Sequence, residues 1–415
     1  MIQERTQCRT CGSKNLKLIL DLGKTALAND FLKPEDVPGY KTSLPLRVVL
    51  CPDCSLVQLA DTVDPRVLYS HYAYVTSTST TMDKHLDKLM SHVLSCGRLG
   101  AGSKVLEIAS NTGLFLKKFK EQGCEVLGIE PASNIADVAI ATAIPTRKEF
   151  FSAATAKNLK AEWGAADLVL GRHVFAHIDD LKDLVAGLET ISHQETLIAF
   201  EVPYAVDFFE HTEYDTIYHE HLSYITVASI EALVKDSAFM LARVDHYPIH
   251  GGSILFQLRH RASKTKPHGS VATALKNEKD MKLAEPVTWA AFAQRVNHIR
   301  IELPAMLRKL KAEGKRIIGY GASAKGNTLL NTCGITIKEL DYIIDNTPFK
   351  QGKIAPGSFI PVRPPEMLLK DQPDYALLLA WNFAPEIIKR ETEFQKRGGR
   401  FIVPIPEPKV VVPTA

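Results

Sequence analysis

Two Cys-x-x-Cys pairs, Cys8–Cys11 and Cys51–Cys54, constrain the fold of this chain more than any other feature of its sequence. The two-residue gap lets both thiolates of a pair face one ion, so two pairs supply the four soft ligands of a tetrahedral zinc shell. Because four protein ligands leave no open position for water, we predict a structural zinc ion held by Cys8, Cys11, Cys51 and Cys54. Four unrelated thiols, or two redox-active pairs, are the alternatives.

The length and composition of the chain indicate a folded protein of more than one domain. Its 415 residues are 45% hydrophobic and 23% charged, and they exceed what one ordinary core encloses. Fifty basic residues nearly balance 47 acidic ones, so the net charge of +3 gives no case for a nucleic-acid partner. The first residues lack the apolar core of a signal peptide, and no segment is apolar and long enough to span a bilayer. We therefore expect a cytoplasmic protein without a membrane partner, and a monomer by default.

The order of strand-like and helix-like patterns divides the chain into three parts. Strand-like apolar runs alternate with helical patterns over residues 71–261, and again after a long amphipathic pattern that begins at Val287. Such alternation favours parallel sheets made of strand–helix–strand units. We predict an α/β protein with a small zinc-binding domain at 1–70 and two Rossmann-like, doubly wound domains at 71–285 and 286–415.

A strand–turn–helix pattern in the second part predicts a nucleoside site. The apolar run KVLEI at 104–108 enters the turn ASNTG, and a helix pattern begins at Leu114. A turn of this kind brings a ligand close to the amides of the helix N-terminus. A second strand pattern ends at Glu130, about 20 residues further on, where a carboxylate can accept hydrogen bonds from both ribose hydroxyls. A strand–turn–helix unit without a ligand is the alternative.

The residues of this turn distinguish between two cofactors. A dinucleotide needs several glycines beside its pyrophosphate, but only Gly113 is a glycine here. A carboxylate at Glu107 would repel a pyrophosphate and would suit a cationic amino-acid tail. The arrangement resembles the first motif of class I methyltransferases, which implies S-adenosylmethionine with Glu107 near its methionine part. We assign cofactor binding to the carboxylate before the turn, to three residues of the turn and to the carboxylate after the second strand, namely Glu107, Ser110, Asn111, Gly113 and Glu130.

The densest group of titratable residues lies at Tyr218, His219, Glu220 and His221. Histidine is the natural general base near neutral pH, and a neighbouring carboxylate can orient it. His177 follows another strand pattern, and the carboxyl ends of neighbouring strands face the same side of a doubly wound sheet. We therefore expect His177 to approach the later group in an active site. A metal site, a polar surface loop and buried structural histidines are the alternatives.

Five segments together make a family resemblance specific. They are the paired cysteines, HVFAHIDD at 173–180, YHEHLSY at 218–224, HGGS at 250–253 and GYGASAKGNTLLN at 319–331. In this order, over nearly the whole chain, they resemble the deoxysugar C-methyltransferases. The resemblance implies an enzyme that methylates C-3 of a nucleotide-linked 4-keto sugar with S-adenosylmethionine. It also implies that the zinc-binding domain acts as a lid and that the last domain helps to bind the nucleotide sugar.

The resemblance assigns roles to individual residues of the central domain. It makes His221 the base that removes the proton beside the ketone. Tyr218 and Glu220 are its partners, which orient the histidine or contact the sugar. His177 matches an active-site position near the enolate oxygen, and Tyr72 matches an aromatic residue that lines the same site.

A second glycine-rich turn, at the start of the last domain, admits two uses. GYGASA matches the dinucleotide fingerprint and Asp345 has the offset of a ribose contact, which taken alone would indicate NAD. The amides of this turn and Lys325 could equally hold the diphosphate of a nucleotide sugar. Because the last domain of the resembled family binds substrate, we assign Gly321, Lys325, Asn327 and Asp345 to that role. A wholly structural turn is the alternative.

Two other functions stay open at this point. One is an NAD-dependent oxidoreductase of a nucleotide sugar. The other is a non-catalytic nucleotide-sugar-binding protein, because Ala109 and Thr112 stand where the family more often has a glycine and an acid. For the methyltransferase, thymidine diphosphate is the expected nucleotide and guanosine diphosphate the alternative.

Overall fold

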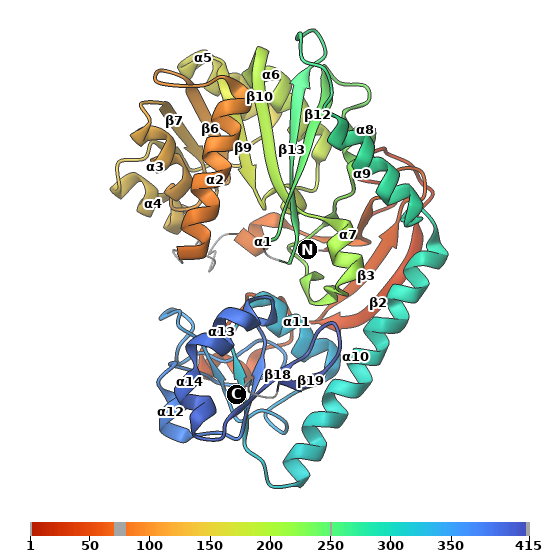
Figure 1. Ribbon diagram of the computed structural model, residues 1–415, viewed down its shortest axis with the longest axis vertical. Coiled ribbons are helices and arrows are strands. Elements are labelled where there is room, and N and C mark those ends of the chain that lie inside the picture. Colours follow the sequence, from red (N-terminus) through yellow and green to blue (C-terminus); the bar gives the residue numbers. More distant parts are fainter. Residues whose placement is uncertain (1, 70–79, 250, 412–415) are drawn as a thin grey trace.

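The computed structural model describes residues 2–69, 80–249 and 251–411, and it arranges them in three parts (Figure 1). An antiparallel sheet is formed mainly by the N-terminal residues. A central α/β part and a C-terminal α/β part follow, connected by the long helix α10 (Pro286–Ala312). The predicted α/β class, with a small cysteine-bearing part and two Rossmann-like parts, is confirmed. None of the helices among the described residues is long and apolar enough to cross a membrane.

The N-terminal sheet is completed by residues from the middle of the chain. Its strands, in order, are β11 (Ser223–Tyr224), β4 (Val57–Leu59), β3 (Leu44–Leu50) and β2 (Lys17–Thr25). β1 (Ile2–Glu4) pairs separately with β5 (Asp61–Val63), which is followed by α1 (Pro65–Tyr69). Strand β11 belongs to the polar segment 218–224 and pairs antiparallel with β4. The polar segment is therefore built into the N-terminal sheet.

The central sheet has seven strands. Their order is β12 (Phe239–Tyr247), β13 (Ser253–His260), β10 (Ser192–Pro203), β9 (Ala166–Arg172), β6 (Lys104–Ile108), β7 (Glu125–Ile129) and β8 (Thr146–Arg147). The strands from β10 to β8 run parallel, and β13 is antiparallel to both of its neighbours. The strand order reverses between β6 and β9. In open sheets of this kind, ligands bind at the carboxyl ends of the strands beside such a reversal.

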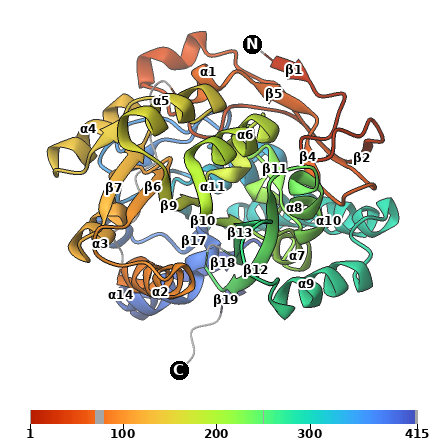
Figure 2. The same ribbon diagram turned by 90° about the horizontal axis from the view of Figure 1, so that it is seen from above.

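Helices cover both faces of the central sheet (Figure 2). The side chains of α2 (Thr80–Gly97) and α3 (Leu114–Glu121) share a core with Val105 on one face. Those of α5 (Ala153–Trp163) and α6 (Leu181–Ile191) share a core with Leu106 on the other face. The remaining helices of this part are α4 (Ser133–Ala141), α7 (Ala205–Glu210), α8 (Val227–Val234) and α9 (Gly269–Asp280).

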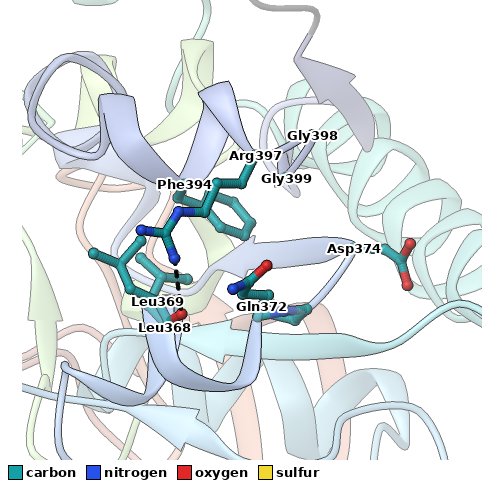
Figure 3. A pocket seen from close by; sticks show the side chains of 9 residues that line it. Leu368, Leu369, Gln372, Asp374, Phe394, Arg397, Gly398 and Gly399 are labelled. Carbon is teal, nitrogen blue, oxygen red and sulfur yellow. Dashed lines mark hydrogen bonds between the residues drawn. The ribbon is translucent and has the colours of Figure 1, made fainter.

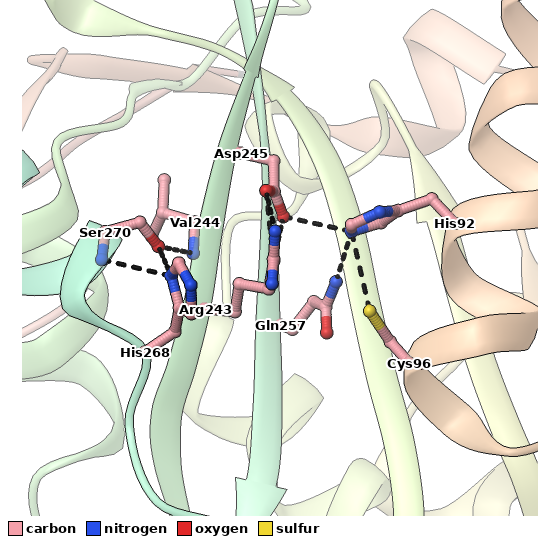
Figure 4. A network of polar contacts seen from close by, with 8 residues as sticks. All are labelled: His92, Cys96, Arg243, Val244, Asp245, Gln257, His268 and Ser270. Carbon is pink, nitrogen blue, oxygen red and sulfur yellow. Dashed lines mark hydrogen bonds and ion pairs between the residues drawn. The ribbon is translucent and has the colours of Figure 1, made fainter.

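A polar network fastens α2 to the edge of the sheet (Figure 4). His92 Nε2 on α2 lies 3.0 Å from Asp245 Oδ2 on β12 and 3.0 Å from the side-chain amide of Gln257 on β13. Asp245 also pairs with Arg243 at 2.8 Å. Because its members satisfy one another, we interpret this network as structural.

The C-terminal sheet repeats the doubly wound plan. Its order is β16 (Val362–Arg363), β15 (Ile343–Ile344), β14 (Ile317–Tyr320), β17 (Tyr375–Leu378), β18 (Arg400–Val403) and β19 (Lys409–Val411). All are parallel except β19, and the order reverses between β14 and β17. Its helices are α11 (Ala324–Cys333), α12 (Met367–Asp371), α13 (Ala384–Arg390) and α14 (Thr392–Lys396). The amphipathic pattern from Val287 becomes α10, which packs against β2 and α11.

Candidate active site

The structure brings together the sulfur atoms of the four predicted zinc ligands. All four lie within 4.8 Å of one another, with Cys8 Sγ 3.5 Å from Cys54 Sγ and Cys11 Sγ 3.6 Å from Cys51 Sγ. Four sulfurs bound tetrahedrally at about 2.3 Å from zinc would be about 3.8 Å apart. The hydroxyl of Thr10 lies 3.3 Å from Cys8 Sγ and 3.2 Å from Cys54 Sγ, where it can donate to a thiolate. The donor set therefore has the size and the softness that zinc takes.

An arginine from the first cysteine pair ties this cluster to the central part. The Arg9 side chain is buried, and its Nε donates to Asp179 Oδ1 at 2.9 Å. Arg5 reaches the other oxygen of Asp179 at 3.2 Å. Asp179 follows the short helix η2 (Phe175–His177) by two residues. The cysteine cluster thus holds the loop that carries His177.

The turn after β6 has the backbone of a glycine-rich loop with only one glycine. Three of its residues have left-handed conformations: Ala109 at φ 54°, Asn111 at φ 51° and Gly113 at φ 73°. A side chain at Gly113 would also come within 2.9 Å of Ile144. Left-handed backbone costs roughly 1–2 kcal/mol for a residue such as alanine. The turn thus keeps a backbone conformation that would let a nucleoside come close to it, and this conformation costs some stability.

Glu107 is the penultimate residue of β6, beneath this turn, and is completely buried. Its Oε1 accepts a hydrogen bond from Arg172 Nε at 3.2 Å, and its Oε2 has no hydrogen-bond partner among the described residues. Burial raises the pKa of Glu107 to about 7 in spite of the nearby guanidinium. An unpaired buried carboxylate oxygen at this position fits the ammonium group of a methionine tail.

Glu130 supports the turn from the end of β7. Its Oε2 accepts from the amide of Asn111 at 3.0 Å, and its Oε1 accepts from the amide of Ala132 at 2.9 Å. Each oxygen retains a second lone pair, so both can still accept from ribose hydroxyls. The hydroxyl of Ser110 is buried against Gly128 and has no partner among the residues that the structure describes.

His221 is held in one tautomer. Its Nδ1 lies 2.9 Å from the carbonyl oxygen of Thr216, which can only accept, so Nδ1 carries the proton. Its Nε2 then accepts from the hydroxyl of Tyr218 at 2.7 Å. Burial lowers the pKa of His221 well below its usual value, and His177 lowers it further. The side chain is therefore a neutral imidazole at neutral pH, which is the form that a general base requires.

The structure brings His177 to His221, as the strand order predicts. Their ring centroids are 4.9 Å apart and the rings are nearly perpendicular, at 89°. The amide of Leu222 donates to the carbonyl of Ala176 at 2.7 Å and joins the two loops. Burial lowers the pKa of His177 to about 4, with a smaller contribution from His173. Two neutral imidazoles therefore lie side by side.

The residues between Tyr218 and His221 face the N-terminal part. Glu220 is buried, and its Oε1 accepts from the side-chain amide of Asn29 at 2.8 Å. His219 Nε2 lies 3.1 Å from the carbonyl oxygen of Pro45. The polar segment thus divides into two pairs, one bonded within the segment and one bonded to the N-terminal part. Tyr72, the remaining predicted active-site residue, lies outside the described residues.

The C-terminal part contacts the segment that precedes His221. Lys325 Nζ lies 3.4 Å from Glu213 Oε2 and 5.3 Å from the centre of the Trp381 ring. The indole nitrogen of Trp381 donates to Asp215 Oδ2 at 2.6 Å. Burial raises the pKa of Asp215 to about 6, although Lys325 opposes this effect. Lys325 and the turn after β17 therefore lie close to His221.

The glycine-rich turn after β14 is built like the turn after β6. Asp345 Oδ2 accepts from the amide of Ala322 at 2.7 Å, and its Oδ1 accepts from the amide of Thr347 at 2.8 Å. Glu130 makes the same two kinds of bond in the central part. Gly321 has φ 91°, and a side chain there would meet Ala380 at 3.0 Å.

The side chain of Asn327 is more deeply buried than we would expect for a residue that only contacts substrate. Its side chain is buried, and its Nδ2 donates to the carbonyl of Ala28 at 2.7 Å. Close by, Leu32 and Ile354 form a short antiparallel bridge. Both contacts join the N-terminal and C-terminal parts, and the role of Asn327 in substrate binding stays a prediction.

Sequence reasoning missed a carboxylate between two histidines. Glu201, at the end of β10, is buried; its Oε1 lies 2.5 Å from His85 Nε2 and its Oε2 lies 3.6 Å from His173 Nε2. Burial acts to raise the pKa of Glu201, but the hydrogen bond with His85 and the nearby His173 and Arg172 lower it to about 2. The available signal was the run of polar residues at the ends of adjacent strands, Glu107, Arg172 and Glu201.

A small hollow in the C-terminal part is not part of this site. It measures about 90 Å³ and is lined by Leu368, Gln372, Phe394 and Arg397, among others (Figure 3). Asp374, which also lines it, precedes β17, so the hollow lies at the amino ends of the strands. The substrate residues predicted above follow the carboxyl ends instead.

The comparisons with known proteins agree along the whole chain. Three family models match in order: "Putative zinc binding domain" over residues 8–69, "Methyltransferase domain" over 82–243 and "C-methyltransferase C-terminal domain" over 248–406. The chain is also 39% identical to the C-methyltransferase NovU of Streptomyces niveus over 405 residues, which are 98% of this chain and 96% of that protein. The chain belongs to this C-methyltransferase family.

The C-methyltransferase also shows slight similarity to solved structures. Magnesium protoporphyrin IX methyltransferase from Synechocystis covers 42% of this chain and 78% of its own, with 14% identity and a TM-score of 0.32. An S-adenosylmethionine-dependent methyltransferase from Archaeoglobus fulgidus covers 40% and 72%, with 17% identity and a TM-score of 0.33. The assignment rests on the family models and on NovU: the protein is an S-adenosylmethionine-dependent C-methyltransferase.

Proposed function

We propose that this C-methyltransferase methylates C-3 of a nucleotide-linked 4-keto-deoxysugar. The observation that carries the proposal is the neutral imidazole of His221, fixed by Thr216 and flanked by Tyr218 and His177. A carbon beside a ketone is acidic enough for such a base to deprotonate. Thymidine diphosphate is the expected nucleotide and guanosine diphosphate the alternative.

The chemistry proceeds by proton removal and carbon–carbon bond formation. His221 Nε2 takes the C-3 proton, and the electron pair of the C–H bond moves into an enolate. His177, whose ring lies 4.9 Å from that of His221, would donate a hydrogen bond to the enolate oxygen and stabilise the developing charge. S-Adenosylmethionine, when bound, would supply a methyl group from its sulfonium to the enolate carbon, and the carbon–sulfur bond that breaks would leave a thioether. Glu107 would bind the methionine part of that cofactor and Glu130 its ribose hydroxyls.

Tyr218 adds a requirement to this scheme. Its hydroxyl donates a hydrogen bond to His221 Nε2, the atom that is proposed to take the proton. The substrate must therefore displace this hydroxyl, which then becomes free to contact the sugar. Because its hydrogen bond is exchanged for another, the displacement costs little.

The C-terminal part is proposed to bind the nucleotide diphosphate. Lys325 offers a cation in the first turn of α11, where the amides of a helix have no intrahelical partners. The four-cysteine site is proposed to hold a structural zinc ion, because its four ligands leave no position for substrate.

Replacing His221 by asparagine tests the proposed base. We expect H221N to abolish exchange of the C-3 proton with deuterium oxide, measured by NMR on a thymidine diphosphate 4-keto-deoxysugar. Binding of S-adenosylhomocysteine, measured by calorimetry, should be unchanged. H193N is the matched control, because His193 is solvent-exposed and pairs with Asp167. Exchange at the wild-type rate in H221N would move the base to another residue.

A calorimetric titration of the wild type separates the proposal from an NAD-dependent oxidoreductase and from a non-catalytic nucleotide-sugar-binding protein. Binding of S-adenosylhomocysteine without binding of NAD supports the proposal. If nucleotide sugar binds and S-adenosylhomocysteine does not, the protein is a non-catalytic sugar-nucleotide binder and the proposal fails.

A further inference from the structure

An ion pair occupies the place where the central sheet reverses its strand order. Glu107 is near the carboxyl end of β6 and Arg172 is at the carboxyl end of β9, and these two strands are neighbours. The guanidinium carbon of Arg172 lies 4.8 Å from the centre of the Phe115 ring, in the first turn of α3. Ligands of doubly wound sheets bind at this reversal. The pair, although buried, therefore lies beside the place where the cofactor is expected to bind.

Both members of the pair have unused hydrogen-bonding capacity. Glu107 Oε2 has no partner among the described residues. Arg172 donates to Glu107 through Nε only, and the described part of the chain offers no hydrogen-bond partner to its two terminal nitrogens. For a fully buried atom such as Glu107 Oε2, the lack of a partner normally costs about 1–3 kcal/mol. A pair that served only stability would be expected to use these atoms.

The unused atoms carry the charge pattern of an amino acid. A free carboxylate oxygen suits an α-ammonium group, and the terminal guanidinium nitrogens suit an α-carboxylate in the bidentate geometry that arginine favours. We propose that Arg172 binds the α-carboxylate of the cofactor's methionine tail, while Glu107 binds its α-ammonium group. The proposal rests on the S-adenosylmethionine dependence assigned above and identifies Arg172 as a determinant of cofactor recognition.

The electrostatics of Glu107 agree with this arrangement. Burial raises the pKa of Glu107 to about 7 even though Arg172 opposes the effect, so one cation does not fully compensate the carboxylate. A second cation at Oε2 would complete the compensation. The zwitterionic tail brings that cation together with an anion for Arg172, so the net charge of the site does not change.

Calorimetry with two ligands and two proteins tests the proposal. The ligands are S-adenosylhomocysteine and its decarboxylated analogue, which keeps the amine and lacks the carboxylate. We expect the wild type to prefer S-adenosylhomocysteine by roughly 10- to 100-fold, the effect of one charge-assisted pair. In Arg172→Met the preference should fall to less than about threefold. Damage to Glu107 affects both ligands equally, so it cancels in this ratio.

Two further variants complete the experiment. Arg243→Met is the matched control, because it breaks an arginine–aspartate pair on the same sheet away from the reversal; its ligand preference should equal that of the wild type. Arg172→Lys keeps the charge beside Glu107 and should retain part of the preference if Arg172→Met does not fold. A wild type that binds both ligands equally, or an Arg172→Met variant that keeps the preference, overturns the role of Arg172 and leaves the methyltransferase function intact. A wild type that binds neither ligand overturns both.

Discussion

At the scale of single residues, the site contains groups that lower the stability of the fold. Glu107 is a buried acid with an unpaired oxygen, and Ala109 keeps a left-handed backbone that favours glycine. Both lie where the cofactor is expected to bind. Such conflicts between stability and position are typical of functional sites. Replacing one of these residues should therefore affect stability and binding in opposite directions.

Glu107→Gln should stabilise the ligand-free protein at alkaline pH and weaken cofactor binding. Below pH 4.5 both the folded and the unfolded wild type hold the proton, so the glutamate costs nothing. Between pH 4.5 and about 7 only the folded state keeps it, so the unfolding free energy of the wild type falls as the pH rises. Above that range the variant should be more stable by up to about 3 kcal/mol.

Urea unfolding at pH 5 and pH 8 measures this difference. Glu125→Gln, on an exposed position of β7, is the control and should match the wild type at both pH values. A Glu107→Gln variant that is less stable than the wild type at pH 8 would show that the ion pair with Arg172 outweighs burial.

At the scale of elements, the contacts of one helix position the predicted substrate residues. Helix α11 carries Lys325 and Asn327, and it approaches β17 so closely that a side chain at Gly326 would lie 2.7 Å from Leu379 Cβ. This glycine therefore sets the distance between the helix and the sheet. Larger residues would push Lys325 away from Glu213 and Asn327 away from Ala28.

Gly326→Ala should lower the unfolding free energy by about 1–2 kcal/mol. The overlap with Leu379 costs about 1–3 kcal/mol, and the better helix propensity of alanine returns up to about 1 kcal/mol. Thermal unfolding measures the change. Gly269→Ala, in the first turn of α9 with no atom within 4 Å, is the control and should change little. Equal stability of both variants would mean that α11 shifts freely on the sheet.

At the scale of the whole molecule, the N-terminal part contacts both the central part and the C-terminal part. It reaches the central part through Arg9–Asp179 and Asn29–Glu220. It reaches the C-terminal part through the bond from Asn327 to Ala28. These contacts surround the segments that carry His177 and His221. The order of the active site should therefore depend on the metal cluster, although the cluster does not touch the reacting atoms.

Cys51→Ser should lose zinc and loosen the distant histidine segments. The wild type should contain about one zinc ion per chain by elemental analysis. In the variant, hydrogen exchange by mass spectrometry should become faster at 173–180 and 218–224 as well as near the cysteines. Cys124→Ser is the control, because Cys124 is a buried cysteine away from the cluster. A metal-free wild type with full stability would contradict the zinc assignment.

The sequence by itself determined the features that depend on short spacings. The cysteine pairs, the strand–turn–helix at 104–114 and the acids at Glu130 and Asp345 could all be found, because each depends on spacings that the local backbone fixes. The α/β class followed from the alternation of strand-like and helix-like hydrophobic patterns along the chain. The convergence of His177 and His221 could be expected as well, because neighbouring strands end on the same side of a doubly wound sheet.

Only the tertiary structure decided which distant side chains meet. Arg172 pairs with Glu107, Glu201 lies between His85 and His173, and strand β11 joins the N-terminal sheet. The sequence places these polar residues near strand ends but does not reveal their partners. Partner choice depends on strand register, on which face a helix covers and on how three parts dock, and these are set by the burial of many apolar side chains at once. The spacing of residues along the sequence does not show this combined effect.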